Sequence, residues 1–119
     1  MAKTIVFDFD GVIHSYKSGW KDVDVIPDPP VEGIKEVIDE LRTQGYEVCV
    51  FSSRVRLSTG WYAVEKWLKK HDIVVDSISA EKPPALVYVD DRAICFNGEC
   101  SGFVEQIKNF KSWVEEKNE

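Results

Sequence analysis

The sequence has few cysteines, no excess of basic residues and no long apolar run. Its three cysteines, Cys49, Cys95 and Cys100, are an odd number, and Cys49 stands in an apolar stretch, so we expect reduced thiols. The formal net charge of −6 argues against binding along an extended nucleic acid, which needs clustered Lys and Arg. The apolar run Ile5–Phe7 ends at Asp8, too soon for a signal peptide or a membrane span. We therefore expect a cytoplasmic protein without membrane contact.

The length and composition predict one folded domain, residues 1–119. Hydrophobic residues make up 44% of the chain and charged residues 30%, as in soluble globular domains. Short apolar runs rich in β-formers predict buried parallel strands at Thr4–Phe7, Tyr46–Phe51, Ile73–Ile78 and Leu86–Val89, and more weakly at Ala93–Phe96.

Segments with helical periodicity alternate with these strands. They are predicted at Val31–Thr43, Thr59–Lys70 and Phe103–Glu116. Their apolar faces are expected to carry Val31, Ile34, Val37, Ile38 and Leu41, then Val64, Trp67 and Leu68, then Phe103, Ile107, Phe110 and Val114. The alternation predicts right-handed β-α-β crossovers and an α/β fold: a doubly wound, Rossmann-like parallel sheet with helices on both faces.

Residues 12–28 lack a regular period and predict a short flap, either a β-hairpin or a loop, after the first strand. Such a flap would lie over the carboxyl ends of the strands, where open α/β sheets bind ligands. Its aromatic residues Tyr16 and Trp20 either stack on a nucleobase or sugar or pack the flap against the domain. The flap and one helix fill the interval between Gly11 and Ser52, so no cap domain is expected there.

Four polar segments each follow a predicted strand. They are Asp8-Phe9-Asp10-Gly11, Ser52-Ser53-Arg54, Lys82-Pro83-Pro84 and Asp90-Asp91. Because strand side chains alternate, Asp8 and Asp10 project to one region while Phe9 turns to the core. Gly11 lets the backbone turn away at low steric cost. If the strand before Asp90 lies beside the first strand, up to four carboxylates share one cleft.

A cluster of Asp8, Asp10, Asp90 and Asp91 needs a cation. Oxygen ligands without close His or Cys pairs predict a hard ion, and Mg²⁺ suits a site of few carboxylates plus a substrate phosphate. The apolar residues around Asp8 do not supply the ligands of a calcium loop. The sequence favours Asp90 over Asp91 as the direct ligand without deciding between them.

The order Asp-x-Asp, Ser, Lys, Asp-Asp, each after an apolar strand, resembles the haloacid dehalogenase superfamily of phosphotransferases over nearly the whole chain. The resemblance implies that Asp8 attacks phosphorus to form an aspartyl phosphate. It implies that Asp10 protonates the leaving group and then activates water. It also implies Ser52 and Lys82 as phosphate binders. We further expect Gly11, Ser53, Arg54 and His14 to contact the phosphate or the rest of the substrate.

The repulsion between nucleophile and substrate explains the need for Lys82 and a cation. A carboxylate ~4 Å from a phosphate dianion faces roughly 8 kcal/mol at an effective dielectric of ~20. We therefore predict a Mg²⁺-dependent phosphomonoesterase acting on a nucleotide or a small phosphorylated metabolite. Without a cap the cleft is open, which leaves a nucleic-acid end, a protein substrate or closure by a second copy as alternatives.

Two other classes of protein use similar residues. A signalling receiver domain also combines an acidic site, a Ser or Thr and a Lys, but it places its acidic pair early and its Lys late. In this sequence Lys82 precedes the pair Asp90-Asp91. A non-catalytic phosphate-binding module would be expected to lack Asp8 or Asp10, and both are present.

Overall fold

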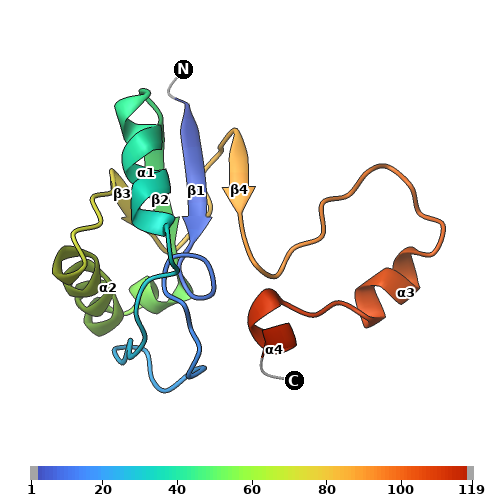
Figure 1. Ribbon diagram of the computed structural model, residues 1–119, viewed down its shortest axis with the longest axis horizontal. Helices are drawn as coiled ribbons and strands as arrows, with labels where there is room; N and C mark the ends of the chain where they lie inside the picture. Colours follow the sequence, from blue (N-terminus) through green and yellow to red (C-terminus); the bar gives the residue numbers. More distant parts are fainter. Residues whose placement is uncertain (1–2, 118–119) are drawn as a thin grey trace.

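The computed structural model describes residues 3–117 and contains one sheet of four parallel strands (Figure 1). The strands are β1 (Thr4–Asp8), β2 (Glu47–Phe51), β3 (Ser77–Ser79) and β4 (Val87–Val89), in the order β3-β2-β1-β4. All pairings are parallel, as predicted. The third strand is shorter than expected because residues 73–76 run outside the ladder. The weak fifth strand, at Ala93–Phe96, does not form.

Within residues 3–117, five helical segments accompany the sheet. They are α1 (Ile34–Thr43), the 3-10 helix η1 (Ser53–Arg56), α2 (Ser58–Lys70), α3 (Phe103–Lys108) and α4 (Trp113–Lys117). The first two predicted helices are confirmed as α1 and α2. The third, predicted to be continuous, is broken between α3 and α4. Asn109 ends α3, and the Ser112 hydroxyl accepts from the Glu115 N–H in the first turn of α4, so residues that favour caps interrupt the helix.

The hydrophobic core lies on one face of the sheet. Ile5 and Phe7 of β1 are in register with Val48 and Val50 of β2, and these side chains share a face. Their buried cluster also includes Ile38 of α1 and Val64, Trp67 and Leu68 of α2. Both long helices therefore cover the same face. The predicted inward residues of α2 are confirmed, whereas Val37 of α1 is 46% exposed and the prediction for it is wrong.

The strand order reverses at β1. The chain adds β2 and β3 on one side of β1 and then returns to place β4 on the other side. This reversal is the topological switch point of an open parallel sheet. The connection from β3 to β4, residues 80–86, contains no helix. The expectation of helices on both faces is therefore wrong for the described part of the chain, because the return crossover is a loop.

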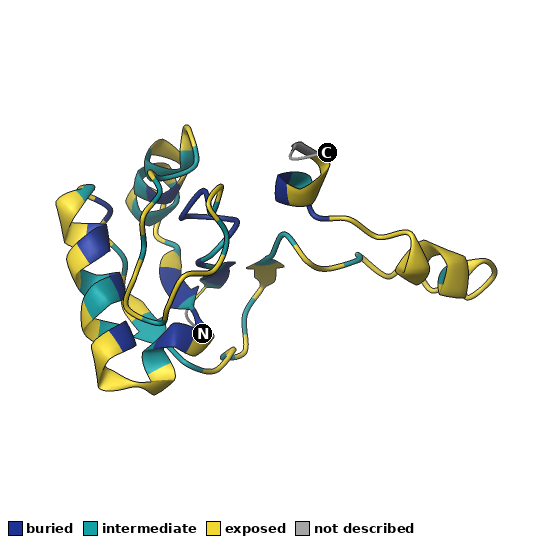
Figure 2. Ribbon diagram, turned by 90° about the horizontal axis from the view of Figure 1, so that it is seen from below, coloured by how far each residue is buried: buried dark blue, intermediate teal, exposed yellow. Residues whose placement is uncertain are grey.

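Residues 93–117 form a C-terminal arm that extends away from the sheet (Figures 1 and 2). Ile107 is 56% exposed and Phe110 is 37% exposed, so their predicted burial is wrong. Val114 is buried as predicted, and Phe103 stacks on Phe96 within the arm. The arm thus packs on the domain at α4 but not along α3.

Residues 9–33, which we call the β1–α1 loop, contain no strand. Isolated bridges join Asp10 to His14, His14 to Pro30 and Asp22 to Val25, without a ladder. The segment is therefore an ordered loop and not a β-hairpin, so the β-hairpin form of the prediction is wrong. Its first residues enter the core, since Phe9 and Ile13 are fully buried.

Two expectations drawn from composition bear on the described residues. Cys49, Cys95 and Cys100 are all free, as predicted. Among the helices of residues 3–117, none combines the length and apolarity that crossing a bilayer requires.

Candidate functional site

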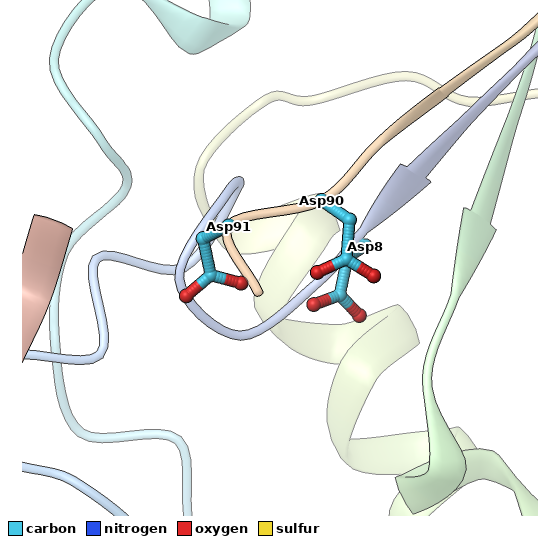
Figure 3. A group of neighbouring side chains, drawn as sticks. All are labelled: Asp8, Asp90 and Asp91. Carbon is cyan, nitrogen blue, oxygen red and sulfur yellow. The ribbon is translucent and has the colours of Figure 1, made fainter. Parts of the chain in front are cut away.

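Three carboxylates converge where β1 and β4 end. Asp8 is the last residue of β1, and Asp90 and Asp91 directly follow β4. Because Phe7 pairs with Val89, the next positions along the two strands, Asp8 and Asp90, come side by side. One carboxylate oxygen from each of Asp8, Asp90 and Asp91 lies within 4.8 Å of the other two (Figure 3). We call these residues the acidic triad. It lies at the switch point of the sheet, where α/β folds bind ligands.

The surroundings of Asp91 fit a cation. Its Oδ1 atom is buried and has no hydrogen-bond partner among the described residues. Gly11 has a positive φ of 88°, and a Cβ at this position would overlap the Asp91 carboxylate, so the glycine makes room for it. A buried carboxylate oxygen without a donor is costly, and a cation would satisfy it. The donor set is oxygen only, which matches a hard ion such as Mg²⁺.

Two members of the acidic triad, Asp8 and Asp91, have raised pKa values. Burial, followed by the charges of Asp90 and Asp91, raises the pKa of Asp8 from 3.8 to about 7. The backbone N–H of Phe9 opposes this rise in part. Burial is also the main reason that the pKa of Asp91 is raised. The ionised carboxylates therefore repel one another, and a divalent cation would relieve that repulsion.

Asp10, two residues beyond Asp8, has the opposite environment. His14 Nδ1 lies 2.8 Å from Asp10 Oδ1. Arg54 donates from Nε to Asp10 Oδ2 at 2.9 Å and from Nη2 to Oδ1 at 3.2 Å. Burial by itself would raise the pKa of Asp10, but the hydrogen bonds from His14 and Arg54 outweigh it and leave the pKa below its usual value. We call Asp10, His14 and Arg54 the Asp10 clamp.

The hydrogen bonds of His14 assign its ring proton. The backbone N–H of Asp28 donates to His14 Nε2 at 3.1 Å, so this nitrogen is an acceptor. The proton is therefore on Nδ1, from which the ring donates to Asp10. The His14 side chain is fully buried and lies against the rings of Phe9 and Trp67. Both ring nitrogens are thus engaged inside the protein.

Arg54 is the largest of the fully buried side chains and is 1% exposed. Its Nη1 atom donates to three carbonyl oxygens of the β1–α1 loop, those of Asp22, Val23 and Val25, at 2.7, 2.9 and 3.3 Å. The ring of Trp20 covers its guanidinium at 4.5 Å. Arg54 therefore links the β1–α1 loop to the carboxylate of Asp10, and Trp20 packs on the guanidinium that makes this link.

Gly60 in α2 makes room for the backbone of Arg54. A Cβ at residue 60 would overlap the Arg54 carbonyl oxygen and would lie 2.9 Å from Cγ2 of Val23. The sequence carried a signal for this contact, because glycine inside a helix costs about 1 kcal/mol relative to alanine and usually has a packing reason.

Ser52 directly follows β2, as predicted, and Lys82 lies in the loop that follows β3. Lys82 Nζ is 3.3 Å from Asp90 Oδ2 and lies over the ring of Phe51. The ammonium group of Lys82 is therefore next to the acidic triad. Ser52 is buried and precedes η1, where its hydroxyl accepts from the Arg54 N–H at 3.2 Å. Ser53 is the exposed first residue of η1.

Two residues near the site were not identified from the sequence. The Asp28 carboxylate accepts from the N–H and the hydroxyl of Ser18 at 2.8 and 2.6 Å, which fixes the β1–α1 loop. Trp113 of α4 donates from its indole nitrogen to the carbonyl oxygen of Gly11 at 2.6 Å. No sequence pattern links Trp113 to Gly11, because the two are far apart in the chain.

Comparison with known proteins identifies the fold alone. No protein-family model and no curated protein matches the sequence. A chain of the solved Pnkp1/Rnl/Hen1 complex is similar over 90% of this chain, with a TM-score of 0.55 and 20% identity. This chain spans 35% of the length of that one. A target protein from Vibrio cholerae is similar over 98% of this chain and 99% of its own, with a TM-score of 0.53 and 22% identity.

Proposed function

We propose that the protein is a Mg²⁺-dependent phosphohydrolase of the haloacid dehalogenase type, without a cap domain, that uses Asp8 as its nucleophile. One observation carries the proposal: the acidic triad and Lys82 come together at the switch point of a parallel sheet, with Asp10 following two residues after Asp8. The residue types match those that phosphoryl transfer needs, a nucleophile, a cation site and positive charge for the phosphate.

Asp8, Asp90 and Asp91, with the backbone carbonyl of Asp10, would hold the ion. When bound, Mg²⁺ neutralises charge on the phosphate and favours the ionised form of the nucleophile. Lys82 adds a second positive charge at the same edge, since it already lies against Asp90. The unpartnered Oδ1 of Asp91 and the space at Gly11 support this assignment.

Asp8 forms the covalent intermediate. One of its carboxylate oxygens attacks phosphorus, the bond from phosphorus to the leaving oxygen breaks, and an aspartyl phosphate results. When no cation is bound, Asp8 is only partly ionised near neutral pH, because its pKa is about 7. Turnover therefore needs the proton on Asp8 removed or displaced.

The environment of Asp10 suits the second half of the reaction, in which water hydrolyses the aspartyl phosphate. A carboxylate with a lowered pKa is ionised at neutral pH, so Asp10 is ready to take a proton from the water that attacks the aspartyl phosphate. Its role as an acid in the first half requires a proton that arrives with the substrate. A phosphate monoester, with a second pKa near ~6, brings one when it binds as a monoanion.

His14 and Arg54 take a positioning role in this proposal. Their polar atoms are buried and bonded to Asp10, Asp28 and the loop carbonyls, so they orient Asp10. Contact with the substrate phosphate is left to Lys82, Ser52, Ser53 and the backbone around Gly11. The substrate class remains a nucleotide or small phosphorylated metabolite.

A phosphatase screen tests the function. Purified protein is incubated with an aryl phosphate, nucleotides and sugar phosphates, with Mg²⁺ or with excess chelator. We expect phosphate release that depends on Mg²⁺, because the acidic triad repels phosphate when it is not neutralised. Undiminished turnover in chelator would contradict the metal role, and no release from any substrate would contradict the function.

A further inference from the structure

A hollow of about 520 Å³ lies beside the acidic triad. Three separate segments line it: the β1–α1 loop at Tyr16 and Lys17, the turn after β4 at Asp91 and Arg92, and the residues around α4, beginning at Lys111. Asp91 belongs both to this wall and to the acidic triad. The hollow is therefore continuous with the place where the substrate phosphate would react, and its size suits a small ligand.

Each wall of the hollow has a hydrogen bond that orders it, and two of these bonds reach residues of the site. These bonds run from the Ser18 hydroxyl to Asp28 at 2.6 Å, from the Arg92 N–H to Asp90 at 2.8 Å, and from the Trp113 indole to Gly11 at 2.6 Å. The three segments are thus held in place before any ligand binds. A ligand does not have to order them, which favours binding.

The charges of the hollow favour an anion. The basic residues of its lining are Lys17, Arg92 and Lys111. Its acidic residues are Asp91, which belongs to the acidic triad, and Glu115. Within residues 3–117, neither the Lys17 ammonium nor the Arg92 guanidinium forms an ion pair. A guanidinium with open donors binds phosphate in a bidentate manner.

Tyr16 adds a strained backbone to the wall. Its φ of 59° lies in the left-handed region, which a bulky residue rarely adopts, and strained residues of this kind cluster at functional sites. Its ring meets His14 edge to face with centroids 5.9 Å apart. The strained residue therefore stands between the Asp10 clamp and the basic residues, where the organic part of a substrate would pass.

We propose that this hollow binds a second phosphate carried by the leaving group, so that the preferred substrates are bisphosphorylated small molecules; the inference rests on the proposed function. The attacked phosphate lies at the acidic triad, and the second one lies among Lys17, Arg92 and Lys111. The C-terminal arm, through α4, takes part in selecting the substrate.

Binding to the Asp8→Asn protein tests the hollow without turnover. With Mg²⁺ present, titration calorimetry should give a Kd for adenosine 3′,5′-bisphosphate about tenfold or more below those of the two adenosine monophosphates. In the same protein carrying Arg92→Gln and Lys111→Gln, both exposed positions, the ratio should fall to within about twofold. Lys66→Gln, on the exposed face of α2, is the matched control and should keep the full ratio.

The outcomes separate the hollow from the proposed function. Equal Kd values for bisphosphate and monophosphates, or a preference that survives the Arg92 and Lys111 substitutions, would overturn the proposal that the hollow binds a second phosphate. Turnover of an aryl phosphate by the wild-type protein tests the function in a separate assay. If the protein prefers the bisphosphate in binding but turns over no substrate, the proposed anion site is supported and the proposed phosphohydrolase activity is contradicted.

Discussion

The acidic triad and the Asp10 clamp share one strand end yet impose opposite electrostatics. Asp8 is surrounded by other carboxylates, and its pKa is raised to about 7. Asp10, two residues later, is bound by a buried arginine and a buried histidine, and its pKa is lowered. Two chemically identical side chains are thus given different protonation states by their neighbours, which is how one site assigns different tasks to two carboxylates.

The Asp10 clamp and the acidic triad also differ in whether their carboxylate oxygens have hydrogen-bond donors. In the Asp10 clamp each carboxylate oxygen has a donor. In the acidic triad the Oδ1 of Asp91 has none among the described residues. The clamp is therefore complete without a ligand, whereas the repulsion within the triad would be relieved by protonation or by a bound cation.

The largest expected effect is that of Asp8→Asn. Removing the nucleophile should reduce turnover of an aryl phosphate by at least ~10³-fold. The same change should raise the thermal unfolding midpoint in chelator at about pH 8, because Asn removes a charge that the triad repels. At about pH 5 the gain should vanish, since wild-type Asp8 is then protonated. Turnover close to wild type would refute the nucleophile.

Asp10→Asn should impair both protonation of the leaving group and activation of the attacking water. We expect losses of ~10²–10⁴-fold in steady-state turnover of alkyl phosphates, which need a proton on the departing oxygen. Aryl phosphates leave without that proton, so their first step should be affected much less. Initial-burst kinetics on the two substrate types measures the difference, and equal losses in the burst would argue against an acid role.

Arg54→Lys should weaken the clamp while keeping the charge. A lysine cannot reach both Asp10 oxygens and the loop carbonyls, so we expect a loss of about 3 kcal/mol in unfolding free energy. Turnover should fall by roughly tenfold to a hundredfold because Asp10 is no longer held in place. Arg56→Lys, an exposed neighbour in η1, is the matched control. Similar effects of the two substitutions would mean that the buried contacts of Arg54 do not matter.

A pH dependence of stability in chelator is also expected. The folded pKa of Asp8 is about 7, above that of an unfolded aspartate, so the native state binds the extra proton between these values. Unfolding free energy should therefore fall as pH rises from about 4 to about 7. Saturating Mg²⁺ should flatten this slope, because the cation favours the ionised triad. Urea titrations followed by tryptophan fluorescence test it; a slope unchanged by Mg²⁺ would contradict the cation site.

Much of this arrangement follows from local sequence patterns. Apolar runs ending in polar residues located β1, β2 and β4, and parallel pairing then placed Asp8 beside Asp90. The four polar segments could be brought to one edge of the sheet because parallel strands end together.

The rest depends on contacts that no local pattern encodes. The Asp10 clamp joins residues far apart in the chain, and nothing in the residues around Arg54 indicates that its side chain points inward to Asp10. The exposed face of α3 shows that helical periodicity does not guarantee burial, because periodicity does not say whether a surface exists to receive the helix.

The covalent step on Asp8 is the central claim, and trapping it tests that claim most directly. Asp10→Asn protein mixed with Mg²⁺ and an aryl phosphate is quenched with acid and its intact mass is measured. The mass should rise by one phosphoryl group, because the nucleophile remains while no base activates water for hydrolysis. The double variant that also carries Asp8→Asn should show no adduct. A phosphoryl adduct that persists without Asp8 would contradict the account.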